Sequence, residues 1–403
     1  MAPLDPALFS VSRLLEGFAR GTLLRPSSSV PNLVDLARAL GGCCGVRHSA
    51  STAAAMELQG LIGPADTYLL VLVDGLGADV VDTLPAGSFL RAHLTGRLRT
   101  VFPATTAAGL TSLATGAWPS EHGVPTWFLF LEEIDATVRP LPYDELATRV
   151  PLDRLGLEPD QLFLVPSLAW RYGRGVTGWM PRAIANSTYS SFLLGPGAAR
   201  GYEHLGEAFD LVERELRGPA TVPRYFYLYV PDVDTISHEK GKWHADVMRH
   251  LQALDDAVRR FRQRTEGAVR IVLSADHGFQ DAPAQRRVPI YRQEGILALL
   301  RQPPAGDSRI GIFHVRKGQV GAFCARFSER FGEHFALVSP EQAEELRLFG
   351  PDPLAPATRR RLGDVLAIGL GDAILEHVER EKPQAAAHSG LSPQEMEIPL
   401  VLA

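Results

Sequence analysis

The sequence has no excess of basic residues and no apolar run long enough to span a bilayer. The 41 Lys and Arg residues are outnumbered by 46 Asp and Glu residues, which gives a formal net charge of −5. A protein that binds nucleic-acid phosphates or anionic lipids through its overall charge needs a basic excess. A membrane helix needs roughly 18 or more consecutive apolar residues, and no run approaches that length. We therefore expect no nucleic-acid polymer and no membrane among its partners, whereas the oligomeric state stays open.

Cysteines are also scarce, and their spacing does not indicate a disulfide or zinc framework. Cys43 and Cys44 are adjacent, Cys324 is distant, and no C-x-x-C pair occurs. The N-terminus has Asp5 where a secretory signal carries basic residues, and Arg13 interrupts the apolar segment. Apolar residues make up 45% of the chain and charged residues 22%, which is typical of a globular protein. We expect a soluble protein in the reducing cytoplasm.

Three apolar runs predict buried strands of a mostly parallel sheet. They are Tyr68–Val73, Tyr225–Val230 and Val269–Leu273, and each contains β-branched or aromatic residues. An acidic residue follows each run, and ligands of open α/β sheets bind beyond the carboxyl ends of the strands. The three segments therefore predict one shared site: Asp74-Gly75, Pro231-Asp232-Val233-Asp234 and Asp276-His277-Gly278.

Helical patterns alternate with these strands and predict an α/β fold with helices flanking the sheet. Asn32 is expected to cap a helix over 33–40 that Gly41 ends, and apolar residues at helical spacing predict another helix around 244–261. Ser339 and Ser392 each begin a capping-box pattern with Pro in the first turn, and a final strand is expected over 398–403.

The predicted site residues are scattered from position 74 to 388, so a division into sequential domains would split the site. We expect one composite domain over residues 1–403. Two regions fit the alternation of strands and helices poorly, at about 128–200 and 295–345. Both are interpreted as insertions that form a cap or roof over the central sheet.

Carboxylates and imidazoles at these strand ends form a candidate metal site. Asp234 and His238 are spaced i,i+4 and share one side of a helical turn, and His388 precedes the last predicted helix. One metal would use Asp234, His238 and His388, and a second would use Asp74, Asp276 and His277. This ligand set suits zinc, with manganese or iron as alternatives. Each residue alone has an ordinary structural role, such as a turn or a cap, but their joint order favours a site.

Two divalent cations bound by three ionised carboxylates would leave the metal site with a net charge of about +1, which suits an anionic phosphate group.

A nucleophile candidate lies in the segment from Val101 to Gly116, where an RTVF strand leads into small, helix-compatible residues. A hydroxyl at such a helix start meets free N–H groups and the positive end of the helix dipole. Metal coordination can favour the alkoxide of a threonine there. Thr106 is the candidate, and its neighbour Thr105 is the competitor.

Five segments in this order resemble the alkaline phosphatase superfamily, and within it the type I phosphodiesterase/nucleotide pyrophosphatase family. The resemblance runs from about residue 68 to the C-terminus and is carried by LVDGLG (72–77), TGAWPSEHG (115–123), PDVDTISH (231–238), SADHG (274–278) and AHSGLSPQEM (387–396). It implies an alkaline-phosphatase-like central, mostly parallel sheet with two zinc ions at its strand ends.

Carried over by position, the resemblance assigns a role to each candidate. It implies that Asp74, Thr106, Asp276 and His277 hold one zinc ion, and that Asp234, His238 and His388 hold the other. The family's spacing between the nucleophile and the TG pair selects Thr106 over Thr105, with a phospho-threonine intermediate that water then hydrolyses. His122 matches a motif position that is not a metal ligand.

The sequence departs from the family at the place where better-known members carry an Asn that helps to bind the phosphoryl oxygen. Here HGVPTW places Trp127 near that point of the substrate-binding site, and an aromatic ring cannot replace an amide donor. Arg171, Arg174 and Arg182 are candidates for gripping the phosphate. Trp170, Trp179 and Tyr172 either stack on a nucleobase or pack the roof.

The expected function is hydrolysis of phosphodiester or pyrophosphate bonds in small, nucleotide-like molecules. A phosphomonoesterase or phosphonate hydrolase on the same site is the alternative within hydrolases. A catalytically silent nucleotide-binding protein is the alternative of another class.

Overall fold

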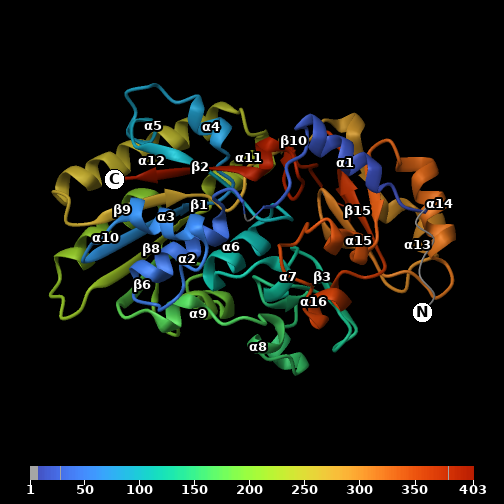
Figure 1. Ribbon diagram of the computed structural model, residues 1–403, viewed down its shortest axis with the longest axis horizontal. Helices are drawn as coiled ribbons and strands as arrows, with labels where there is room; N and C mark the ends of the chain where they lie inside the picture. The colour runs from blue at the N-terminus through green and yellow to red at the C-terminus, as the bar shows by residue number, and fades with distance from the viewer. Residues whose placement is uncertain (1–7, 28, 380) are drawn as a thin grey trace.

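A seven-stranded sheet forms the centre of the computed structural model, which describes residues 8–27, 29–379 and 381–403 (Figure 1). Neighbouring strands pair parallel except at β18, which is antiparallel to both of its neighbours. The strands, in spatial order, are β2 (Leu94–Arg99), β18 (Glu397–Leu402), β9 (Arg270–Ser274), β1 (Thr67–Val73), β8 (Arg224–Val230), β6 (Gly175–Pro181) and β7 (Ala199–Tyr202).

The three predicted strands are β1, β8 and β9, and β1 lies between the other two. All residues of β1 are buried, as are nearly all of β8 and β9, because helices cover both faces of the sheet. Val73 pairs with Val230, and Leu72 with Ser274. The segments that follow these strands therefore leave the sheet at one edge. The fold class predicted from the sequence is confirmed.

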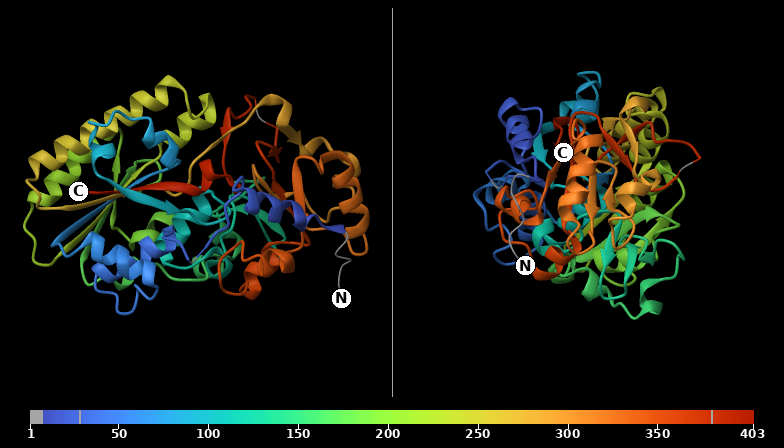
Figure 2. Two further views of the ribbon diagram at one scale, coloured as in Figure 1. Left: turned by 45° about the horizontal axis from the view of Figure 1, so that its top comes forward. Right: turned by 90° about the vertical axis from the view of Figure 1, so that its right-hand side faces the viewer.

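Helices cover both faces of the central sheet (Figure 2). One face carries α2 (Leu33–Cys43), α3 (Ala53–Ile62), α6 (Thr106–Thr115) and α9 (Thr188–Leu194). The other carries α4 (Ala78–Asp82), α5 (Phe89–Ala92), α10 (Leu205–Arg217), α11 (Asp232–Lys240) and α12 (Ala245–Arg264). Within the described ranges, none of the helices is both long and apolar enough to cross a membrane.

The helix predicted over 33–40 begins at the predicted cap but ends later than expected. The Asn32 side chain accepts a hydrogen bond from the Asp35 N–H, and α2 continues to Cys43. A Cβ atom at Gly41 would come within 2.3 Å of Ser49 Oγ. The glycine thus serves close packing inside the helix and does not end it. The capping boxes at Ser339 and Ser392 are both present.

A second, four-stranded antiparallel sheet lies at the opposite end of the molecule from α10 and α12 (Figure 1). Helices pack around it and bury two apolar clusters. Its strands, in spatial order, are β12 (Ala305–Asp307), β13 (Ile310–Phe313), β15 (Val365–Gly369) and β14 (Phe335–Val338). The nearby helices are α1 (Val11–Arg20), α13 (Glu294–Leu297), α14 (Val320–Phe331), α15 (Pro340–Glu345) and α16 (Pro356–Arg361).

Short elements connect the two sheets. A small sheet contains β3 (Leu129–Leu131), β4 (Ala136–Arg139) and β5 (Asp144–Glu145), and two strand pairs join β10 (Gln280–Asp281) to β17 (Ala386–Ala387) and β11 (Arg287–Pro289) to β16 (Ile374–Glu376). The remaining short helices are α7 (Pro119–His122), α8 (Pro159–Leu162) and α17 (Pro393–Met396).

The expectation that 128–200 is an insertion outside the central sheet is wrong for its last part. β6 and β7 are strands of that sheet. The β6 sequence GVTGWMP has two glycines and a proline and lies beside the edge strand, so it lacks the continuous apolar run of a central strand. The region expected at 295–345 contains three strands of the second sheet, β12, β13 and β14, together with the helix α14 between the last two, and β15 completes that sheet at Gly369. The single composite domain remains a prediction.

The amphipathic helix α12 provides a test of the core. Leu251 is fully buried against the sheet, whereas Gln252 is exposed. We expect Leu251→Ala to lower the free energy of unfolding by about 2–5 kcal/mol, because it leaves a cavity in the core. Gln252→Ala is the matched control on the same helix and should change it by about 0.5 kcal/mol or less. Denaturant unfolding curves of the two variants check this, and equal destabilisation would contradict the packing of Leu251 against the sheet.

Candidate metal and catalytic site

The predicted site residues come together beyond the carboxyl ends of β1, β8 and β9. Asp74 follows β1, Asp276 and His277 follow β9, and Asp234 and His238 lie on α11 after β8. His388 comes from the turn between β17 and α17. Segments more than 300 residues apart in the sequence therefore contribute to one small volume.

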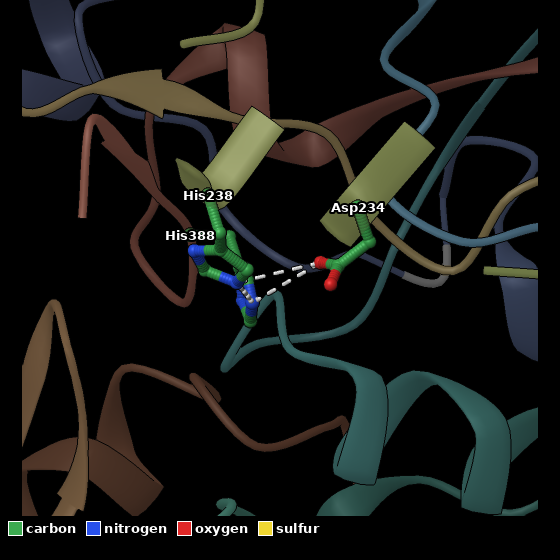
Figure 3. Close-up of side chains that lie close together, drawn as sticks. All are labelled: Asp234, His238 and His388. Carbon is green, nitrogen blue, oxygen red and sulfur yellow. Dashed lines mark hydrogen bonds and ion pairs between the residues drawn. The ribbon is translucent and has the colours of Figure 1, made fainter. Parts of the chain in front are cut away.

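The first candidate metal cluster contains Asp234, His238 and His388 (Figure 3). Nε2 of His238 lies 3.5 Å from Asp234 Oδ1, and Nε2 of His388 lies 3.7 Å from the same oxygen. The two Nε2 atoms are 3.1 Å apart. In Figure 3 both rings and the carboxylate point toward one another, so a single cation placed between them would be within reach of all three.

The second candidate cluster contains Asp74, Asp234 and His277. His277 Nε2 lies 3.3 Å from Asp74 Oδ1, and the His277 ring stacks on His388 with 3.9 Å between centroids. Asp234 belongs to both clusters. This grouping differs from the expected set of Asp74, Asp276 and His277, which stays a prediction.

Asp276 lies beside the second cluster. Its Oδ1 accepts hydrogen bonds from the N–H groups of Gly75 and His277, and its Oδ2 lies 3.6 Å from His277 Nε2. Neither Asp276 Oδ2 nor Asp234 Oδ1 has a hydrogen-bond partner among the described residues, although both atoms are buried. A buried carboxylate oxygen without a donor is costly unless a cation neutralises it. The donor set and these two oxygens therefore fit divalent cations.

Backbone carbonyl groups fix the orientation of the three imidazoles. Nδ1 of His238 faces the Ala386 carbonyl at 3.0 Å, Nδ1 of His277 faces that of Gly278 at 3.0 Å, and Nδ1 of His388 faces that of Ala104 at 3.1 Å. For His277 and His388 a carbonyl oxygen as the neighbour favours a proton on Nδ1, which leaves Nε2 to a metal. Nδ1 of His238 also lies 2.7 Å from the Gln384 amide nitrogen, so its neighbours do not select one tautomer. All three Nε2 atoms face the clusters.

Thr106 and Thr105 occupy different environments. Thr106 is the first residue of α6, and its Oγ1 lies 3.1 Å from His277 Nε2 and 3.4 Å from Asp74 Oδ1. The Thr105 hydroxyl donates instead to Asp307 Oδ2 at 2.6 Å. The hydroxyl beside the candidate metal ligands is therefore that of Thr106.

A glycine in α6 allows this helix to lie close to the loop after β9. A Cβ atom at Gly109 would come within 2.9 Å of Asp276 Cβ and 3.0 Å of its carbonyl oxygen. All ten residues of α6 are buried. The small residues that the sequence shows in this segment therefore set the distance between Thr106 and the ligands.

A cavity of about 720 Å³ opens onto the two clusters and Thr106. Half-buried Trp127 lines it, together with many apolar side chains from β6, α9 and β16. Arg171, Arg174 and Arg182 do not line this cavity; Arg182 pairs with Glu203 on the exposed surface. Trp170, Trp179 and Tyr172 do not line it either: Trp179 packs on Phe226 and Tyr172 on Tyr225.

Sequence reasoning missed three groups of the site. The Tyr229 hydroxyl donates to Asp74 Oδ2, Asp307 accepts from Thr105, and Arg287 lines the cavity. The sequence could have pointed to Tyr229, because the alternate tyrosines of the YFYLYV run share one face of β8 and Tyr229 lies near its end. Asp307 and Arg287 lie in short strands without a distinctive pattern.

The site concentrates negative charge in a buried place. Burial, and then the charge of Asp74, raise the pKa of Asp234 well above its usual range and that of Asp276 to about 8. Burial alone would lower the pKa of His277, but Asp276, Asp74 and Asp234 outweigh it and raise the value to about 10. Without a metal, the cluster therefore retains protons at neutral pH.

His122 is buried outside the clusters. Its Nδ1 accepts from the Val124 N–H at 3.1 Å, and its Nε2 lies 3.0 Å from Ser112 Oγ. Burial lowers its pKa to about 3, so the ring stays neutral. These contacts give His122 a packing role.

Comparisons with known proteins bear on the family and the fold. The family model described as type I phosphodiesterase/nucleotide pyrophosphatase matches residues 68–390. The chain is similar in structure to murine ectonucleotide pyrophosphatase/phosphodiesterase 5 (TM-score 0.60, 14% identity, covering 83% of this chain and 87% of that chain). It is also similar to phosphonoacetate hydrolase from Sinorhizobium meliloti 1021 in complex with phosphonoformate (TM-score 0.59, 15% identity, 83% and 89%). The search of curated proteins found no match.

The retained protons predict a pH-dependent metal affinity. A metal ion that binds at the second cluster would have to displace the proton of His277, whose pKa lies near 10, and its charge would also favour loss of the proton of Asp276 beside the cluster, whose pKa lies near 8. Zinc affinity should therefore rise between pH 6 and 8, by roughly tenfold per pH unit for each displaced proton. Competition with a chromogenic chelator, corrected for the chelator's own protonation, measures this. A flat profile over that range would show that no proton is exchanged for the metal.

Proposed function

This chain belongs to the type I phosphodiesterase/nucleotide pyrophosphatase family of hydrolases, and on that premise we propose that it cleaves phosphodiester or pyrophosphate bonds of small molecules with Thr106 as nucleophile. The observation that carries the proposal is the position of Thr106 Oγ1, 3.1 Å from His277 Nε2 at the start of α6. The phosphorus atom would bind in the cavity beside this oxygen.

Two divalent cations complete the proposed site. Asp234, His238 and His388 would hold one, and Asp74, His277 and Thr106 the other, with Asp276 beside the second. Zinc is the proposed metal because imidazole and carboxylate ligands suit it, and manganese and iron are the alternatives. Such cations would lower the pKa of the Thr106 hydroxyl and neutralise charge on the phosphoryl oxygens.

The residues of this chain position the reacting groups. The Thr106 oxygen forms a bond to phosphorus as the bond from phosphorus to the leaving oxygen breaks, which gives a phospho-threonine. Water on the opposite side then hydrolyses that ester and regenerates the hydroxyl. Free N–H groups in the first turn of α6 would bind a phosphoryl oxygen. They would take over the role of the asparagine side chain of better-known family members, near whose position this chain has Trp127.

The charge of the site favours a monoanion. Two dications against Asp74, Asp234 and Asp276 leave about +1, and the nearby carboxyl of Asp307 lowers this further when it is ionised. A phosphodiester carries one negative charge, whereas a phosphomonoester at neutral pH carries about two. Trp127 and the apolar wall of the cavity would contact the organic group that a diester retains.

A phosphonate hydrolase is the second candidate, because the organic group bonded to phosphorus could occupy the same wall. The similar phosphonoacetate hydrolase shares the fold. A catalytically silent nucleotide-binding protein is the alternative of another class, and it would retain the clusters without turnover.

We also propose a reducing, cytoplasmic location, since Cys43, Cys44 and Cys324 are all free thiols.

Threonine variants test the nucleophile. Thr106→Ala should lower turnover of a diester by on the order of 10³-fold or more, because the bond-forming oxygen is lost. The bound metals should stay largely in place, since the other five proposed ligands remain, with Asp276 beside them. Thr105→Ala is the matched control: its hydroxyl donates to Asp307, and activity should stay within about tenfold of wild type. Loss of turnover in Thr105→Ala, with near-wild-type turnover in Thr106→Ala, would identify Thr105 as the nucleophile.

Substrate preference and metal dependence form a second test. Purified protein should contain about two zinc ions per chain, and a chelator should abolish hydrolysis until zinc is restored. A p-nitrophenyl phosphodiester should be cleaved faster than p-nitrophenyl phosphate, because the site suits a monoanion. A preference for the monoester would favour the phosphomonoesterase alternative, and hydrolysis of phosphonoacetate alone would favour the phosphonate hydrolase. Metal binding without turnover of any of these would indicate a silent binding protein.

A further inference from the structure

An ion pair outside the metal clusters is completely buried. Arg309, in the turn between β12 and β13, and Glu395, in α17, have no exposed surface, and Arg309 Nε lies 2.7 Å from Glu395 Oε1. The pair links the second sheet to the segment that follows His388. Because burying two charges is costly, such a pair calls for a reason beyond stability.

Both members of the pair hold the segment from His388 to Ser392. Oε1 of Glu395 accepts from the Gly390 N–H at 2.7 Å, and its Oε2 accepts from the Ser392 hydroxyl at 2.7 Å. The backbone N–H of Arg309 donates to Ser389 Oγ at 2.9 Å. The two residues that follow His388 are thus each bound to one member of the pair.

The backbone at this segment depends on these contacts. Ser389 has a φ of 92°, in the left-handed region that a non-glycine residue rarely adopts. A Cβ atom at Gly390 would lie 2.6 Å from Arg309 Nε and 2.6 Å from Glu395 Oε2. The strained serine therefore needs its partner on Arg309, and the next position has room only for glycine against the pair.

Other contacts fix the pair itself. The Arg309 guanidinium donates Nη1 to the Ala373 carbonyl at 2.8 Å and Nη2 to the Gly371 carbonyl at 2.7 Å. The backbone carbonyl of Glu395 accepts from the Gly278 N–H at 2.9 Å, in the residue after His277. Glu395 thus contacts the residues that follow both His277 and His388, and Arg309 connects them to the second sheet.

We propose that Arg309 and Glu395 are positioning residues that set the orientation of His388 toward its metal. The proposal rests on the metal-binding role proposed above. His388 lies in a turn rather than on a helix or strand, so the place of its ring depends on the backbone of residues 388–390 as well as on the Ala104 carbonyl that its Nδ1 faces. The pair supplies the rigidity that the helix α11 gives to Asp234 and His238.

Two variants test the proposal through zinc affinity, measured with Zn²⁺ against a chromogenic chelator. Glu395→Gln removes the charge but keeps the size, and Ser389→Ala removes the acceptor of the Arg309 N–H without leaving a buried charge. In each variant we expect one of the two zinc ions to bind about 10–100-fold more weakly, as for other partners of metal ligands. The second ion should keep its wild-type affinity. If Glu395→Gln fails to fold, Ser389→Ala decides alone.

Asp255→Asn is the matched control. Asp255 is a buried carboxylate that pairs with Arg259 and accepts the N–H groups of Phe89 and Leu90, on a helix that holds none of the ligands. It should lower stability without changing the affinity of either zinc ion. Cobalt-substituted protein gives a second readout, since the visible spectrum of the affected site should change in the two test variants alone.

The outcomes separate this inference from the proposed function. Wild-type protein that binds no zinc would end the metal proposal itself. Wild-type protein that binds two zinc ions, with both affinities unchanged in Glu395→Gln or, if that variant does not fold, in Ser389→Ala, would overturn the positioning role. Equal weakening of both ions in the test variants and in Asp255→Asn would show a general loss of stability and would overturn it as well.

Discussion

Asp74, Asp234 and Asp276 place three carboxylates beside three imidazoles in a buried space, and this concentration of charge constrains the rest of the structure. Protons on His277 and Asp276 relieve part of the repulsion, and cations would relieve it further. Two of the carboxylate oxygens are buried without a hydrogen-bond donor from the part of the chain that the structure describes. An arrangement of this kind is unfavourable for stability alone, and it is explained by a function that uses metal ions.

The two sheets contribute different parts of the site. The central sheet brings β1, β8 and β9 side by side, so that their carboxyl ends deliver the acidic residues to one edge. The second sheet supplies Asp307, which receives the Thr105 hydroxyl, and Arg309, which is buried against Glu395. The division suggests that the first sheet provides the chemistry and the second holds the loops around it.

Much of this arrangement could be predicted from the sequence, because the signals were local. The apolar runs before Asp74, Asp234 and Asp276 identify the strands and also the edge at which the residues meet. β6 could not be predicted, since glycines and a proline replace the apolar run beside the sheet edge. The sharing of Asp234 between the two clusters depends on side-chain directions that spacing does not determine. Asp307 and Arg309 are 202 and 86 residues from their partners, and only the folded chain brings them together.

Anomalous diffraction at the zinc absorption edge, from crystals grown with zinc, would locate the metal ions. We expect two peaks: one between Asp234, His238 and His388, and one beside Asp74, His277 and the Thr106 oxygen. Crystals of active protein with no peak at either position would contradict this expectation.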